Sequence, residues 1–300
     1  MTNTWNAINI SDCILAIGSN PAENHPAAFG HITEAKKRGA KLISVDPRFT
    51  RTSARADIYA PMRSGTDIAF INGMIKYVLD DIALNPESCN MTYITEYTTA
   101  PCLINPDFKG PDELDGLFSG YLGSLNETDS AKRKYDASTW QYHMDENDIP
   151  KKDRALTDQN CVFQIMKRHF ARYTPEMVSA ICGTPKEIFL ETCRTFAATG
   201  QVGKAGTVLY AMGTTQHTYG SQNIRAYAIL QLLLGQYWCR WRWHPGYKRR
   251  VQRPGLNRPC PTGCLYHHEL ASLPTIRIPV PVVATVSMPV LSMCLALRAT

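Results

Sequence analysis

Short apolar runs separated by helical patterns recur along the first part of the chain. The run 13–18 is apolar throughout, which is typical of a strand buried on both faces, and polar turn residues follow it. Apolar positions spaced for one helical face continue over 27–38, and Gly39 stands where a C-terminal cap belongs. The apolar run 41–45 then completes a strand–helix–strand unit. A crossover of this length favours a parallel sheet.

The same succession of elements returns further along the chain. A third short strand is predicted over 58–61, followed by a helix over 68–79 that the pair Thr66-Asp67 would cap. Near the end of this part, 207–211 predicts a strand, and a helix is predicted over 221–234. The expected fold is therefore α/β, with a doubly wound, mostly parallel sheet.

The middle of the chain shows no regular spacing of apolar residues, because Asn, Asp, Thr, Gly and Pro interrupt every helical or strand pattern between 85 and 159. We predict a surface-exposed, loop-rich insertion there. Helical patterns return over 160–170 and 174–198, where Thr174-Pro175 and Thr184-Pro185 are typical helix starts. The predicted organisation is a nucleotide-binding segment, the insertion, a second helix and strand segment, and a tail, over 1–84, 85–159, 160–235 and 236–300.

Composition and charge place the last boundary near Gly235. With 44% hydrophobic and 19% charged residues, the whole chain is outside the range of disordered chains and small disulfide scaffolds. The tail 236–300 carries nine of the 32 Lys and Arg residues but one of the 26 acidic residues. The rest is nearly neutral, which excludes a general attraction to nucleic acid. No helical or strand period organises the tail, so we expect it to be unstructured.

Candidate chemistry lies in the loops that follow the predicted strands, because ligands of open α/β sheets bind beyond the carboxyl ends of the strands. In the first loop, Gly18 permits close backbone approach, Asn20 and Asn24 supply amides, and a helix N-terminus would attract phosphate. The alternative is an ordinary turn with a capping residue.

The later loops offer further polar groups. Asp46 would accept hydrogen bonds from a base or ribose, and Arg48 and Arg51 would hold phosphates, unless they form a surface ion pair. The hydroxyls and the Gln216 amide of the last loop suit the edge of a heterocycle. His217 and its counterpart in the first loop, His25, are candidate general bases, but no complete catalytic constellation accompanies either. The cysteines of the first 235 residues stand singly and are expected to be core or surface thiols.

Four segments taken together resemble the large (alpha) subunit of molybdenum- or tungsten-dependent formate dehydrogenase, which belongs to the molybdopterin oxidoreductases. These segments are 1–5, 18–26, 45–52 and 63–70. The resemblance continues through shorter motifs as far as 215–217 and covers essentially 1–235. It implies a sheet of the molybdopterin oxidoreductase type, and that sheet would be incomplete in this chain.

The resemblance also implies an activity and a set of cofactors. The parent enzyme would oxidise formate to carbon dioxide at a bis-molybdopterin guanine dinucleotide centre with molybdenum or tungsten, and would hold a [4Fe–4S] cluster. Its implied partners are an iron–sulfur electron-transfer subunit and a cytochrome b subunit, and its implied location is the periplasm. The residues implied to bind the cofactor are Gly18, Asn20, Glu23, Asn24, Asp46, Arg48, Gly65, Asp67, Met212, Gly213 and Gln216.

The chain departs from this family at both ends. The family's cluster cysteines and its selenocysteine or cysteine metal ligand precede the motif that begins at Met1, so no catalytic or metal-binding residue is implied within the chain. A selenocysteine codon, UGA, just upstream would account for this start. A one-base frameshift after Gly235 would account for the tail, because a shifted Trp codon reads as glycine at Trp238, Trp241 and Trp243.

The expected protein is therefore a fragment of a catalytic subunit, inactive with formate by itself and cytoplasmic if it is made as given. Two alternatives remain at this point. One is a stand-alone nucleotide- or RNA-binding module with a basic tail, whose RNA binding would depend strongly on salt. The other is a gene product that does not accumulate, because an incomplete sheet leaves apolar surface uncovered.

Overall fold

The computed structural model describes residues 5–111, 113–123 and 134–236. Two sequence predictions concern residues beyond this part. The unstructured tail is predicted from 236 on, after a frameshift following Gly235, and all of it except Gln236 lies outside the described residues, as do residues 1–4 of the segment that begins at Met1. The prediction is wrong for Gln236, because its side chain accepts a hydrogen bond from the Gly206 N–H and donates one to the Thr199 carbonyl. The expected α/β architecture can be compared with the structure everywhere else.

Four parallel strands organise the described part of the chain, in the order β3-β2-β1-β4. Strand β1 (Cys13–Ile17) pairs with β2 (Lys41–Asp46) on one side and with β4 (Gly206–Tyr210) on the other. Strand β3 (Ile58–Pro61) pairs with β2 at the opposite edge. The predicted parallel, doubly wound sheet is confirmed. The chain adds β2 and β3 on one side of β1 and later places β4 on the other side.

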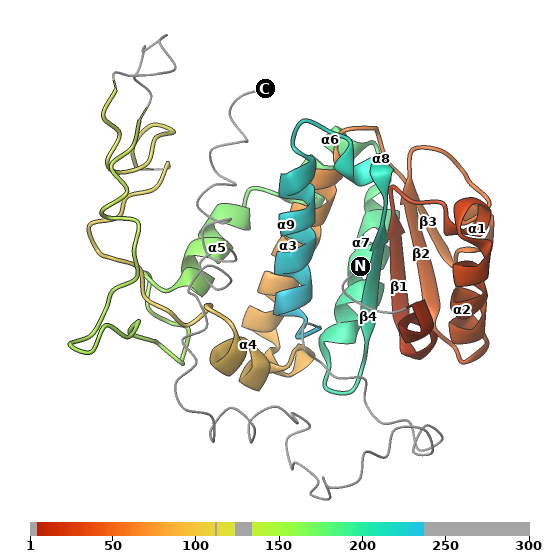
Figure 1. Cartoon of the computed structure of the whole chain (residues 1–300), viewed down its shortest axis with the longest axis horizontal. Coiled ribbons are helices and arrows are strands. Elements are labelled where there is room, and N and C mark those ends of the chain that lie inside the picture. Colours follow the sequence, from red (N-terminus) through yellow and green to blue (C-terminus); the bar gives the residue numbers. More distant parts are fainter. Residues whose placement is uncertain (1–4, 112, 124–133, 237–300) are drawn as a thin grey trace, which may run out of the picture.

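Helices cover both faces of the sheet (Figure 1). The helix α2 (Pro26–Lys37) and the 3₁₀ helix η1 (Trp5–Ile10) cover one face, while α3 (Asp67–Leu84), α7 (Lys186–Ala197) and α9 (Gly220–Leu233) lie on the other. Every side chain of β1 is buried, and successive side chains enter opposite cores. The hydrophobic run predicted to be buried on both faces is buried on both faces.

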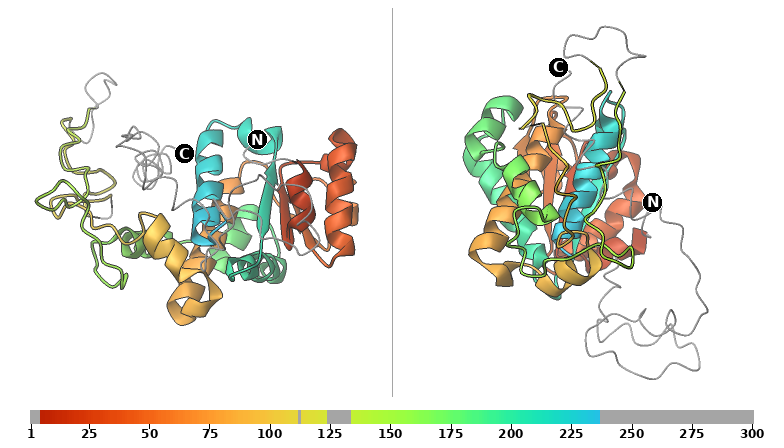
Figure 2. Two further views of the ribbon diagram at one scale, coloured as in Figure 1. Left: turned by 60° about the horizontal axis from the view of Figure 1, so that its bottom comes forward. Right: turned by 90° about the vertical axis from the view of Figure 1, so that its left-hand side faces the viewer.

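A third group of helices packs outside α3. It contains α4 (Met91–Tyr97), α5 (Val162–Phe170) and α6 (Pro175–Cys182). The loops between α4 and α5 extend on the side away from the sheet (Figures 1 and 2). The remaining short helices are α1 (Pro21–Asn24), α8 (Met212–Thr215), η2 (Ser53–Arg55), η3 (Pro86–Ser88) and η4 (Ala198–Gly200).

The insertion predicted over 85–159 contains more buried residues than expected. Its first part contains α4, and the side chains of Cys89, Ile94 and Cys102 belong to the main core. Farther along, Phe118 is buried within a separate cluster of aromatic rings. The prediction of a surface-exposed insertion is wrong for these residues, because polar turn residues between them hide the few apolar positions from any periodic pattern.

The three threonines predicted at helix starts differ in whether their side chains cap the helix. Thr174 caps α6 as predicted, and its side chain accepts a hydrogen bond from the Met177 N–H. Thr66 precedes α3 but donates to the Arg63 carbonyl 2.7 Å away, and it makes no side-chain cap bond. Thr184 donates to the Pro61 carbonyl at the end of β3. The two predictions that fail do so because the hydroxyls donate elsewhere, Thr66 to a carbonyl in its own turn and Thr184 to a distant strand.

The thiols of the described residues are all buried. Burial raises the pKa of Cys13 to about 12 and the pKa of Cys182 to about 11. The described cysteines are Cys13, Cys89, Cys102, Cys161, Cys182 and Cys193. They are core residues rather than reactive surface thiols. Among the described helices, none is both long enough and apolar enough to cross a bilayer.

Candidate functional site

The loops after β1 and β4 meet backbone to backbone at the carboxyl edge of the sheet. Gly18 has a φ of +55°, in the left-handed region that favours glycine. A Cβ atom on Gly18 would lie 2.5 Å from the Thr214 Oγ1, and one on Gly213 would lie 2.6 Å from the Gly18 carbonyl oxygen. Both glycines are therefore needed for the close approach, and two predicted site residues are brought together.

The first loop is also tied to the loop that follows β2. The Asn20 Oδ1 accepts a hydrogen bond of 2.8 Å from the Thr52 hydroxyl, and Asn20 donates to Glu23. Glu23 in turn lies 3.2 Å from the Arg51 Nε. The side chains of Asn20 and Glu23 thus shape this loop, and Arg51 forms the surface ion pair that was the alternative to phosphate binding.

Asp46 ends β2 and turns the following backbone. Its Oδ1 accepts a hydrogen bond from the Arg48 N–H at 3.0 Å, and its carbonyl accepts one from the Tyr59 hydroxyl at 3.1 Å. Within the described part of the chain, the Arg48 guanidinium has no hydrogen-bond or ion-pair partner. Arg48 is exposed and so remains available for an anion at this edge.

The third and fourth loops are joined by His217 and Tyr219. The Tyr219 hydroxyl donates to the Gly65 carbonyl, and its ring stacks on His217 with centroids 5.8 Å apart and an interplanar angle of 9°. The His217 Nε2 donates to the Gly213 carbonyl at 2.8 Å, which requires the proton on Nε2. The same nitrogen lies 3.9 Å from an oxygen of Asp67.

Asp67 is the most deeply buried charged group of the site, with a relative exposure of 2%. Desolvation raises the pKa of its carboxyl, although its own backbone N–H, His217 and the Thr214 hydroxyl all favour the charged form. Its Oδ1 has no hydrogen-bond partner among the described residues. A buried acceptor without a partner is costly unless a ligand supplies a donor.

The remaining predicted residues take different positions. Asn24 pairs through its Oδ1 with the His25 Nδ1 at 2.8 Å. Met212 is 65% exposed, and the Gln216 amide approaches its sulfur at 3.6 Å. The hydroxyl of Thr214, predicted to suit the edge of a heterocycle, is buried and lies 3.3 Å from the Ile17 carbonyl instead. Tyr219, which joins two loops that are distant in sequence, was not predicted, because no pattern pointed to it.

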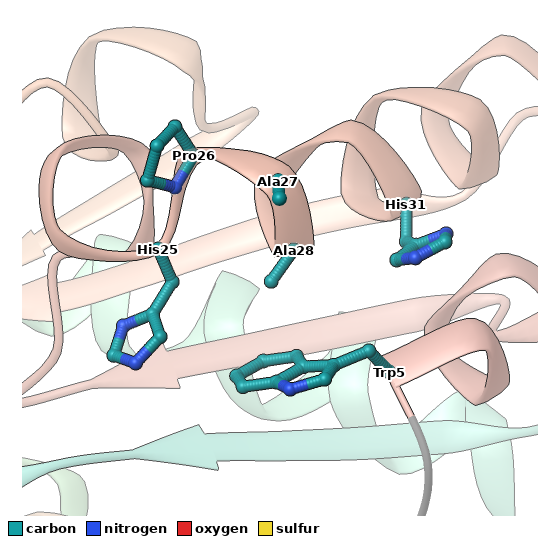
Figure 3. Close-up of a pocket in the computed structure, with 6 residues that line it drawn as sticks. All are labelled: Trp5, His25, Pro26, Ala27, Ala28 and His31. Atoms are coloured by element: carbon teal, nitrogen blue, oxygen red, sulfur yellow. The ribbon is translucent and has the colours of Figure 1, made fainter.

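His25 faces a pocket beside the first loop rather than a second catalytic group (Figure 3). The pocket has a volume of about 250 Å³. Its lining residues are Trp5, His25, Pro26, Ala27, Ala28 and His31. The His25 ring lies 5.4 Å from the Trp5 ring. No cluster of three or more potential metal-binding side chains occurs in the described ranges.

Known proteins are similar to this chain over most of its length. The family described as molybdopterin oxidoreductase matches residues 1–88. The chain is 51% identical over 235 residues to the formate dehydrogenase subunit alpha of Megalodesulfovibrio gigas. It is 48% identical over 236 residues to the nitrate-inducible formate dehydrogenase major subunit of Escherichia coli (strain K12). Residues 1–88 therefore belong to the molybdopterin oxidoreductase family.

The alignments with the two relatives cover 78% of this chain and 22% of each relative. The chain thus spans about a fifth of the length of the curated relatives it matches. Among solved structures, acetylene hydratase from Pelobacter acetylenicus is similar over 78% of this chain and 24% of its own chain, with 19% identity and a TM-score of 0.47.

Membership of the family implies a molybdopterin cofactor with molybdenum or tungsten. The carboxyl edge fits one end of such a group. Gly18 and Gly65 both have positive φ, and Thr214 and Tyr219 of the last loop occupy the positions of their missing Cβ atoms, so the two glycines bring that loop to the edge. Asp67 presents a buried acceptor without a partner among the described residues, and Arg48 presents an unpaired cation there. The edge therefore offers the Asp67 carboxylate to a heterocycle rich in hydrogen-bond donors, and the Arg48 guanidinium to a phosphate.

Proposed function

We propose that this chain forms the part of a formate dehydrogenase alpha subunit that holds a guanine nucleotide arm of the molybdopterin cofactor. The observation that carries the proposal is the buried Asp67 Oδ1, an acceptor without a partner among the described residues, at an edge where glycine loops meet. The level of identity to formate dehydrogenase alpha subunits supports the choice of reaction.

Each residue has a distinct task in this proposal. The Asp67 carboxylate would accept hydrogen bonds from a base that carries adjacent donors, as guanine does. Arg48 would pair with a phosphate, and Gly18 would bring the last loop to this edge. Asn20 and Glu23 hold the first loop against Thr52 and Arg51, so they position the loop for binding.

The bound cofactor supplies the two-electron chemistry that converts formate to carbon dioxide and a proton. The chain's own residues contribute binding and orientation to that reaction. We propose a bis-molybdopterin guanine dinucleotide centre with molybdenum or tungsten and a [4Fe–4S] cluster for the complete enzyme. Its partners would be an iron–sulfur subunit and a cytochrome b subunit, and its location the periplasm. The purified chain alone should not reduce a dye with formate.

Nucleotide binding by the purified chain tests the proposal. Isothermal titration calorimetry with guanosine diphosphate should give saturable binding, and adenosine diphosphate should bind at least tenfold more weakly. Replacing Arg48 with alanine should weaken guanosine diphosphate binding about tenfold, the loss expected for one charged hydrogen-bonded contact.

A matched control separates the site from general charge. Arg38→Ala removes the same charge at the end of α2, near the amino ends of the strands, and should leave the affinity unchanged. Equal binding of both nucleotides, or equal losses in the Arg48 and Arg38 variants, would contradict the proposal.

A further inference from the structure

The side chains of His217 and Tyr219 hold two points of the turn that begins α3. The Tyr219 hydroxyl donates to the Gly65 carbonyl. The rings of Tyr219 and His217 stack, with centroids 5.8 Å apart and an interplanar angle of 9°. The His217 Nε2 lies 3.9 Å from the Asp67 Oδ2. Because Gly65 and Asp67 are close neighbours in the chain, the stacked pair contacts the same short turn at both of its ends.

The backbone at Gly65 makes room for the tyrosine. Gly65 has a φ of +80°, and a Cβ atom added there would lie 2.9 Å from the Tyr219 hydroxyl oxygen. A separate anchor of the same turn comes from α6, because the Arg63 N–H donates to the Cys182 carbonyl at 2.8 Å. Tyr219 adds the connection between this turn and the last loop.

The His217 ring is held in one orientation. Its Nε2 donates to the Gly213 carbonyl at 2.8 Å, and since a carbonyl only accepts, Nε2 carries a proton whether the ring is neutral or charged. The distance of 3.9 Å to the Asp67 Oδ2 is too long for a hydrogen bond, so this contact is electrostatic. The other carboxylate oxygen, Oδ1, has no hydrogen-bond partner among the described residues.

We propose that Tyr219 is a positioning residue of the ligand-binding edge: its hydroxyl anchors the turn at Gly65, and its ring holds His217 beside the Asp67 Oδ2, so that the Oδ1 is left for the ligand. The identity of the ligand rests on the proposed function. The arrangement of Tyr219, His217 and Asp67 belongs to the unliganded chain, so it can be tested by itself.

Several titratable groups besides His217 face Asp67 from the surrounding elements. They are Asp46 at the end of β2, Cys182 of α6, Tyr227 of α9 and Tyr219 itself. Burial, and then the charge of Asp67, raise the pKa of Tyr219, so this phenol is neutral at any pH where a carboxyl titrates. The effect of Tyr219 on Asp67 therefore comes from its position and packing rather than from its own charge.

A double-mutant cycle in the free chain measures whether Tyr219 holds His217 in place. The readout is the pH midpoint of the Asp67 side-chain carboxyl carbon, titrated by NMR. His217→Phe keeps a flat ring and removes the nitrogen, so it should move this midpoint to higher pH. In a Tyr219→Leu chain, which has lost the stack, the same replacement should displace the midpoint by no more than about half as much. Comparing two displacements cancels the change in burial that Tyr219→Leu causes by itself.

The matched control is Tyr97→Leu. Tyr97 also packs on a neighbouring aromatic ring, that of Tyr93, with centroids 5.8 Å apart, but it lies on α4 outside α3. In this background the displacement caused by His217→Phe should be the same as in the wild-type chain.

Nucleotide binding provides a second cycle. Tyr219→Leu should weaken guanosine diphosphate binding about tenfold at pH 7. In an Asp67→Asn chain the same replacement should weaken binding less than about twofold, because the contact that Tyr219 supports has already been removed. Equal losses in both chains would overturn the inference.

The two cycles keep the proposals separate. If the wild-type chain does not bind guanosine diphosphate, the proposed function fails, while the Asp67 midpoints still decide the role of Tyr219. A lower melting temperature in Tyr219→Leu with an undiminished His217→Phe displacement would show a merely structural role and overturn the inference.

A further variant covers the case in which Tyr219→Leu does not fold. Tyr219→Phe keeps the ring and removes the hydroxyl that anchors it on Gly65. The displacement caused by His217→Phe should then be smaller than in the wild-type chain. An undiminished displacement in the folded Tyr219→Phe chain would overturn the inference.

Discussion

Gly213 lies directly against Gly18, and a Cβ atom on Gly213 would be 2.6 Å from the Gly18 carbonyl oxygen. The two glycines are separated by nearly the whole described chain. They meet because β4 pairs with β1 in parallel register, so both strands end at the same height. The contact closes the carboxyl edge between the first and the last loop, and no side chain fits within it.

Replacing Gly213 with alanine should therefore destabilise the chain. Because backbone atoms oppose the new methyl group on the other loop, the loops must separate, and we expect a loss on the order of 1–3 kcal/mol in the free energy of unfolding. Gly30→Ala is the control, since no heavy atom lies within 4 Å of its added Cβ on α2. That variant should gain about 0.5–1 kcal/mol in urea unfolding. Equal effects would contradict the close contact.

The fold was largely predictable because its strands are buried on both faces. The continuous apolar run 13–18 by itself predicts a buried strand. Gly39 marks the end of α2, where the φ of +96° favours glycine. The order of the strands was not predictable beyond the parallel pair, because the place of β4 beside β1 depends on packing between distant segments. Residue patterns within one segment do not contain that information.

Replacing Asp67 with asparagine should stabilise the unliganded chain at neutral pH. Burial raises the pKa of the Asp67 carboxyl, so ionisation of this group opposes folding once the pH exceeds its unfolded value of about 3.9. The cost develops as pH rises from that value through the folded pKa and is absent below it. The stability difference between variant and wild type should thus be positive at pH 7 and vanish in acid.

Chemical unfolding of both proteins over this pH range measures the difference. A destabilised Asp67→Asn chain at pH 7 would mean that His217 and Thr214 outweigh the burial of the carboxylate. Nucleotide affinity should move in the opposite direction, because the variant loses the proposed acceptor for the base. Stability and binding therefore conflict at this residue.

The chemistry of the site was less predictable than its location. Loops after strands pointed to Asp46 and Gly18, and the resemblance pointed to Asp67. No pattern of residues predicts that the Asn20 amide oxygen accepts from Thr52, or that Thr66 donates to the Arg63 carbonyl instead of capping α3. Hydroxyl and amide side chains have many partners of similar energy, and tertiary packing selects among them.

Replacing Thr174 with alanine should cost about 1 kcal/mol, because its side chain caps α6 by accepting the Met177 N–H. Thr174→Ser should restore the loss, since serine caps equally well. Thr66→Ala should lose no cap, although Thr66 also precedes a helix. Urea unfolding of the three variants gives the comparison. Equal losses in Thr174→Ala and Thr174→Ser would mean that packing of the methyl group, rather than capping, stabilises this helix start.

Strand β4 forms one edge of the described sheet, so no described strand pairs with its outer side. At its first residue, Gly206, two glutamine side chains make the hydrogen bonds that a neighbouring strand would make. Ala205 faces β1, because its carbonyl accepts from the Cys13 N–H at 3.2 Å. Alternate residues of a parallel strand bond to opposite sides, so Gly206 must face away from β1. Its N–H donates to the Gln236 Oε1 at 2.9 Å, and its carbonyl accepts from the Gln231 amide at 3.2 Å.

Replacing Gln236 with alanine should leave the Gly206 N–H without this partner, and the Gln236 amide would no longer donate to the Thr199 carbonyl at 2.8 Å. Because Gly206 is buried, we expect a loss of about 1–3 kcal/mol in urea unfolding and faster hydrogen exchange at its amide. Gln201→Ala is the control, since Gln201 is exposed, and it should change stability by less than about 0.5 kcal/mol. Unchanged exchange at Gly206 in the Gln236 variant would mean that water satisfies this edge and that the glutamine does not stabilise it.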